Sequence, residues 1–124
     1  MELTPVLPSG RQVIEGYGAS GFRVAGIHYA GSILVFPDAT LEWPVSRFED
    51  VTLDALQPVV ERGGTEILLL GCGARMERMP AALRQALKAA GISLEAMDTG
   101  AACRTYNVLL AEDRRVAAAL LRAS

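Results

Sequence analysis

The sequence lacks long hydrophobic runs and any excess of basic residues. Its longest apolar stretches, such as residues 67–70 and 117–121, are far shorter than the roughly 20 residues that a membrane span requires. Twelve basic residues stand against fourteen acidic ones, and the net charge of −2 argues against nucleic-acid binding. Residues 1–5 lack the basic and apolar regions of a secretory signal, so we expect a cytoplasmic protein.

Cysteine and histidine are also scarce. Cys72 and Cys103 lie far apart without a CxxC motif, and His28 is the only histidine. This excludes the familiar zinc spacings and a secreted disulfide framework, so we expect no metal and no cofactor. His28 has no catalytic partner at a recognisable spacing, and we interpret it as structural.

Apolar residues are abundant instead. They make up 51% of the 124 residues, charged residues make up 21%, and the mean hydropathy is +0.26. A chain of this length can bury about two-thirds of its unfolded surface. We therefore expect one domain over residues 1–124 with a large core.

The first third of the chain has the pattern of β-structure. We predict strands over residues 12–17, 22–29, 32–36 and 41–45, after an irregular lead-in over 1–10. The second and third would form a hairpin around Ala30-Gly31. Gly26 lies where the apolar alternation slips, which indicates a β-bulge. Pro44 cannot donate to a ladder, so the fourth strand should be an edge or end there.

The remainder has an α/β pattern. We predict a helix over 53–62, a strand over 66–70, a helix from Pro80 to Gly91, a strand over 92–97, a helix after it, and a last helix containing 117–121. Thr52 or Asp50 can cap the first helix, and Pro58 should kink or shorten it.

The order strand–helix–strand over residues 66–97 predicts two parallel strands whose carboxyl ends share one edge of a sheet. Ligands of open α/β sheets bind outside that edge. An acid, a hydroxyl and a glycine open the helix that follows, which points backbone N–H groups at the same spot. The candidate ligand-binding residues at this crevice are Gly71, Cys72, Gly73, Arg75, Asp98, Thr99, Arg104 and Asn107.

Each candidate also has a structural interpretation. The turn at Gly71 lacks the third glycine of a dinucleotide fingerprint and the lysine of a P-loop, which favours a plain turn. Asp98 can orient a ligand, but a capping role, for which Thr99 competes, is favoured. Arg75 and Arg104 can clamp an anion or remain solvated. Asn107 and its neighbour Tyr106 are interpreted as packing the helix or satisfying buried backbone.

Three further features of the sequence also have both a functional and a structural interpretation. The helix N-terminus and Arg104 could lower the pKa of the Cys103 thiol and allow a redox pair with Cys72, but two buried core residues are the favoured interpretation. Trp43 and Phe36 can anchor a partner or pack the core, and the core is favoured. The negative end of a helix accounts for the remaining cluster, Arg114, Arg115 and Arg122.

The motifs together resemble a known family. They include Ile67-Leu68-Leu69-Leu70, Gly71-Cys72-Gly73, Pro80, residues 97–107, Leu109 and residues 112–120, and in the first part Gly16, Gly21, Phe22, Ile27, Gly31 and Pro37. Thr105-Tyr106-Asn107 is the most specific element. This pattern resembles the domain-of-unknown-function 498 family, which includes a mitochondrial assembly factor for respiratory complex I. Cys72 departs from the family pattern, where threonine is more frequent.

The resemblance implies a three-layer α/β domain with a central mixed, partly parallel sheet, a β-rich N-terminal part and helices on the sheet. It establishes no activity or catalytic residue. We therefore expect a non-enzymatic assembly or interaction factor for a protein complex, with unidentified protein partners and peripheral contact with a membrane surface. The alternative is a small-molecule or anion-binding protein, or an enzyme, that uses the crevice. The oligomeric state stays open.

Overall fold

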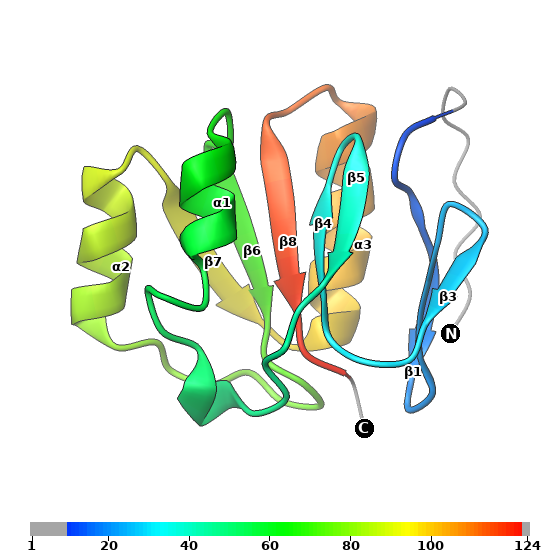
Figure 1. Cartoon of the computed structure of the whole chain (residues 1–124), viewed down its shortest axis with the longest axis horizontal. Helices are drawn as coiled ribbons and strands as arrows, with labels where there is room; N and C mark the ends of the chain where they lie inside the picture. The colour runs from blue at the N-terminus through cyan, green and yellow to red at the C-terminus, as the bar shows by residue number, and fades with distance from the viewer. Residues whose placement is uncertain (1–9, 123–124) are drawn as a thin grey trace.

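The computed structural model describes residues 10–122, and nearly all of the predicted lead-in lies outside this range. The elements along the chain are β1 (Ile14–Gly18), β2 (Gly21–Val24), β3 (Ile27–Tyr29), β4 (Ile33–Phe36), β5 (Ala39–Glu42), the 3₁₀ helix η1 (Phe48–Asp50), α1 (Gln57–Arg62), β6 (Ile67–Gly71), α2 (Ala81–Ala89), β7 (Ser93–Met97), α3 (Thr99–Ala111) and β8 (Val116–Leu120) (Figure 1).

A mixed five-stranded sheet, in the order β5-β4-β8-β6-β7, forms the centre of the fold. Strands β6, β7 and β8 are parallel, whereas β4 runs antiparallel to both β5 and β8. Strands β1, β2 and β3 form a separate antiparallel sheet. The mixed α/β fold expected from the resemblance is confirmed.

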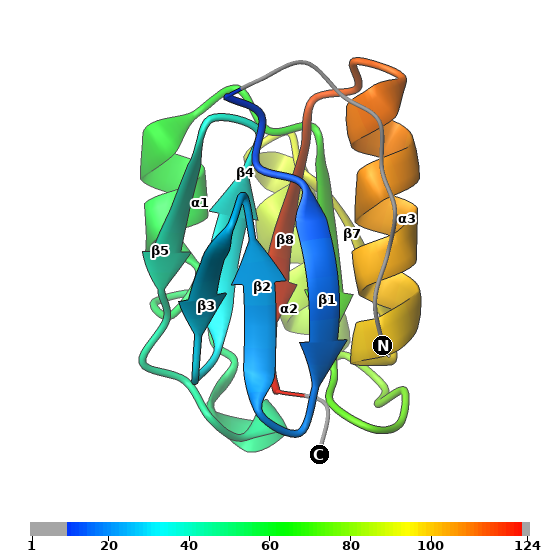
Figure 2. The same ribbon diagram turned by 90° about the vertical axis from the view of Figure 1, so that its right-hand side faces the viewer.

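Both faces of the five-stranded sheet are apolar, and each is covered by another layer of the domain. Helices α1 and α2 cover one face, and α3 covers the other together with the three-stranded sheet (Figures 1 and 2). Leu68 and Leu70 of β6 pack toward α1 and α2, whereas Leu69 packs toward α3. Because successive strand residues point to opposite faces, a strand covered on both sides reads as a continuous apolar run.

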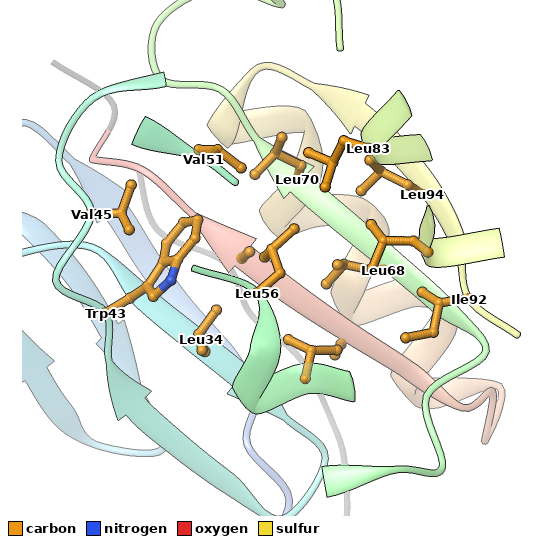
Figure 3. Packing of buried hydrophobic residues seen from close by; sticks show 14 of the residues in the cluster. Leu34, Trp43, Val45, Val51, Leu56, Leu68, Leu70, Leu83, Ile92 and Leu94 are labelled. Carbon is orange, nitrogen blue, oxygen red and sulfur yellow. The ribbon is translucent and has the colours of Figure 1, made fainter. Parts of the chain in front are cut away.

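The core beneath α1 and α2 also contains Trp43, which lies near Leu34 and Leu56 (Figure 3). The Trp43 indole Nε1 donates to the carbonyl oxygen of Ala55 at 2.8 Å, so its polar group is satisfied inside the core. Phe36 is also buried. Both aromatic residues therefore belong to the core, as the sequence favoured.

The predicted hairpin of strands 22–29 and 32–36 is wrong. The chain turns at Ala25-Gly26 instead, where both residues have positive φ (48° and 83°), and β3 pairs with β2. This geometry matches a two-residue turn of the type that fits the twist of β-hairpins. Gly26 is therefore a turn residue, and the register shift that marks a bulge lies in β1, between Ile14 and Gly16.

The last predicted helix is also wrong, because residues 116–120 form β8, a central strand. Ala117 and Ala119 pack toward α1 and α2, while Val116, Ala118 and Leu120 pack toward α3. Alanine favours helices, and a short apolar run cannot be assigned by periodicity alone. Here the position between β4 and β6 decides, since it supplies ladder partners on both sides.

The other elements agree with the sequence within a few residues. Helix α1 begins at Gln57, later than predicted, because Pro58 suits only the first turn of a helix. Neither predicted cap acts on it, since the residue before it is Leu56, without a side-chain cap. Strand β5 is an edge of its sheet and ends before Pro44, as proposed.

Candidate functional site

The carboxyl ends of β6 and β7 meet at one edge of the sheet, the lower edge in Figure 1. The two turns that leave these strands are bonded to each other directly. The Cys72 backbone N–H donates to the carbonyl oxygen of Met97 at 2.8 Å, and that of Thr99 donates to the carbonyl oxygen of Gly73 at 2.9 Å. The turns thus lie side by side, as parallel strands require.

Thr99 fills the space between the turns. Its side chain is fully buried, and its Oγ1 accepts from the Gly73 N–H at 2.9 Å and donates to the carbonyl oxygen of Leu121 at 2.6 Å. Gly71 lies so close that an added Cβ would stand 2.9 Å from this hydroxyl. One threonine therefore joins the ends of β6, β7 and β8, and we name these contacts the Thr99 joint.

The first turn of α3 is capped by Asp98 and packs against β1. Asp98 is the N-cap residue, and its carboxylate accepts from the Ala101 N–H at 2.9 Å, which confirms the favoured interpretation. Gly100 lies against Tyr17 of β1, where an added Cβ would meet the ring at 2.9 Å. Arg104 donates to the hydroxyl of the same tyrosine. This end of α3 is therefore shaped to receive β1.

Asn107 holds β1 through both groups of its amide. Its Nδ2 donates to the carbonyl oxygen of Ile14 at 2.8 Å, and its Oδ1 accepts from the Ile14 N–H at 3.0 Å. Ile14 is fully buried and lies at the bulge of β1. The amide thus satisfies backbone groups that the irregular strand leaves over, which agrees with the role that the sequence favoured.

The cysteines do not form a pair. Both are free and buried, and they belong to the two core clusters on opposite faces of the sheet. Burial raises the pKa of the Cys103 thiol to about 12 and outweighs the lowering effect of nearby Arg104. Burial also raises the pKa of the Cys72 thiol. Neither residue has the depressed thiol pKa that redox chemistry requires.

The eight candidate residues therefore have unequal surroundings. Gly71, Cys72, Gly73 and Thr99 are buried, Asp98 and Asn107 are partly buried, and Arg75 and Arg104 are exposed. The polar groups of Asp98, Thr99 and Asn107 all bond within the chain. A ligand at this edge stays a prediction, and its charged contacts would come from the two arginines.

Sequence reasoning missed the opposite edge of the sheet. Two surface pockets lie there, of about 500 and 880 Å³, and six cationic side chains line them. The signal available was the position of basic residues in the last turns of predicted helices. Arg62 ends α1 and Lys88 lies in the last turn of α2.

Residues 10–122 contain no group of three or more histidine, cysteine, aspartate or glutamate residues able to hold a metal ion. None of the helices in this range is long and apolar enough to cross a membrane.

Comparison with known proteins places the chain in a family. Residues 14–121 match the family described as "Protein of unknown function (DUF498/DUF598)". The chain belongs to this DUF498 family. Residues Asp98 to Asn107, which carry the Thr99 joint and the Asn107 contacts, lie inside the matched region.

Relatives with the same domain occur in bacteria and animals. An uncharacterised protein of Rhodobacter capsulatus is 42% identical over 91% of this chain and 86% of its own length. The NADH dehydrogenase [ubiquinone] 1 alpha subcomplex assembly factor 3 of Danio rerio is 38% identical over 91% of this chain and 66% of its own length. The chain spans 58–66% of the length of the animal assembly factors that it matches.

The same fold occurs in solved structures of proteins of similar length. A crystal structure of a Bordetella parapertussis protein superposes with a TM-score of 0.85 at 37% identity, covering 91% of this chain and 97% of that one. The three-layer arrangement is therefore shared at nearly full length.

Proposed function

We propose that this DUF498 chain is a non-enzymatic assembly factor that binds protein subunits of a membrane-associated NADH dehydrogenase. The observation that carries the proposal is the 38% identity to an NADH dehydrogenase assembly factor over 91% of the chain. The match covers nearly all of this chain but only 66% of the relative's length.

The geometry at the carboxyl ends of β6 and β7 supports a protein-binding role and gives no support to catalysis. A catalytic site needs polar groups aimed at a substrate, and those of Thr99, Asn107 and Asp98 are engaged with the chain's own backbone. The buried thiols hold their protons at neutral pH. The polar groups of this motif therefore stabilise the domain itself, which supports a role in binding through the surface.

The proposal also includes a setting in the cell. We place the chain at the cytoplasmic face of the inner membrane, in peripheral contact with a membrane complex, and its partners are proteins. The cytoplasmic location expected from the sequence stays a prediction.

Two experiments in the native cell test this function. Affinity purification of the tagged chain after mild crosslinking should recover subunits of NADH dehydrogenase above an untagged background. Deletion of the gene should lower the amount of assembled NADH dehydrogenase on native gels, and the wild-type gene should restore it. Unchanged assembly together with no recovered subunit would contradict the proposal.

A further inference from the structure

Half of the chain's cations gather at the amino-end edge of the parallel strands. Among the twelve lysine and arginine residues, six line the two pockets there: Arg11, Arg62, Arg84, Lys88, Arg114 and Arg115. Only three acids line the same pockets: Asp38, Glu66 and Asp113. On a chain of net charge −2, this edge is therefore positive.

The cations divide sharply between paired and unpaired. Each acid has one arginine as its partner, in the pairs Arg62–Asp38, Arg11–Asp113 and Arg115–Glu66. Of the six cations that line the pockets, the other three, Arg84, Lys88 and Arg114, have no carboxylate partner among residues 10–122. All three line the 880 Å³ pocket, which we name the β7 pocket. It therefore suits negatively charged groups.

The β7 pocket lies at the amino ends of β6 and β7, where residues 91–94 line it. Strand β7 is the last strand of the five-stranded sheet, so its outer edge begins at this pocket. The Ser93 N–H donates to β6's neighbour Glu66, and the Met97 carbonyl accepts from Cys72. Because alternate residues of a strand point their backbone groups to opposite sides, those of Leu94 and Ala96 face away from β6.

Arg84 already bonds to the outer edge of β7. Its guanidinium donates to the outward carbonyl oxygen of Leu94. The arginine covers the unpaired edge only through this one hydrogen bond. A partner strand can still bind there, because the guanidinium can exchange the Leu94 carbonyl for a carboxylate of the partner.

We propose that an extended acidic segment of a partner protein adds as a strand to the outer edge of β7 and places carboxylates among Arg84, Lys88 and Arg114. The main-chain edge selects a polypeptide, since peptide groups repeat at the spacing of the strand. The unpaired cations select its charge. The inference rests on the proposed function, because it assigns the surface that such a partner would use.

A peptide of alternating glutamate and valine, seven residues long and blocked at both ends, is the probe. Titrated into the ¹⁵N-labelled protein, it should protect the amides of Leu94 and Ala96 from exchange. The double variant Lys88→Gln/Arg114→Gln should weaken binding roughly threefold to twentyfold, as for two screened ion pairs. The matched variant Arg47→Gln/Arg78→Gln removes the same charge from exposed positions outside the pocket and should change binding less than about twofold.

Several results would overturn the inference: no protection at Leu94 and Ala96, equal weakening by both double variants, or equal binding of the peptide with lysine in place of glutamate. Tighter binding of an oligothymidylate at the same edge would assign the surface to nucleic acid instead. If the peptide fails while NADH dehydrogenase subunits still co-purify with the chain, the proposed function stands and only this surface is wrong.

Discussion

Replacing Thr99 by valine removes one hydroxyl and tests the Thr99 joint with little change of shape. The substitution leaves the Gly73 N–H and the Leu121 carbonyl without their partner in a buried place. Each of the two groups costs about 1–3 kcal/mol, so we expect a loss of about 2–6 kcal/mol. Domains of this size have roughly 5–15 kcal/mol of stability in total, and the change should be large in urea unfolding followed by circular dichroism.

Two matched variants isolate the hydroxyl. Thr99→Ser keeps it and removes only a buried methyl group, at about 1 kcal/mol. Thr105→Val makes the same chemical change at a half-buried position of α3 and should stay within about 0.5 kcal/mol of wild type. A valine variant at position 99 that is as stable as the serine variant would refute the reasoning, because packing alone would then explain the residue.

Three further predictions concern other contacts. Gly100→Ala gains about 1 kcal/mol of helix preference. Its Cβ would meet the Tyr17 ring, which costs about 1–3 kcal/mol, so we expect a net loss of up to about 2 kcal/mol in urea unfolding. A gain in stability would show that the ring moves aside without cost. Trp43→Phe should cost about 1–3 kcal/mol by leaving the Ala55 carbonyl unpaired, and a smaller change in thermal unfolding would discount this bond. Iodoacetamide should modify Cys103 only on unfolding. The pKa of the Cys103 thiol is about 12 in the folded protein, against an ordinary value of 9.0, so the free energy of unfolding should fall as the pH rises between these values. Rapid labelling of the native protein, or a free energy of unfolding that does not change over this pH range, would contradict this prediction.

The sequence predicts the parallel βαβ unit well because each of its boundaries is marked locally. Strand β6 is a continuous apolar run, and Pro80 and Gly91 bracket α2. The same local reasoning fails for β8, where three alanines have no preference for strand. It also fails at the β2–β3 turn, since Ala25 takes a positive φ that sequence reasoning reserves for glycine or asparagine.

For the candidate site, the sequence locates the polar residues but not their partners. Asp98 caps the helix that it precedes, a contact within one turn of chain. Thr99 and Asn107 instead bond to Leu121 and Ile14, which are distant in sequence. Such contacts depend on the position of β8 and on the docking of β1, and no local pattern encodes either.

The Asn107 side chain on α3 holds the three-stranded sheet in place through its two bonds to Ile14. Hydrogen exchange of the Asn107→Ala variant tests this role most directly, with exposed Val108→Ala as the control. Losing both bonds to Ile14 should cost about 2 kcal/mol and speed exchange roughly 30-fold in β1 and β2, while β6 and β8 keep their protection. Unchanged exchange in β1 and β2 would contradict the claim.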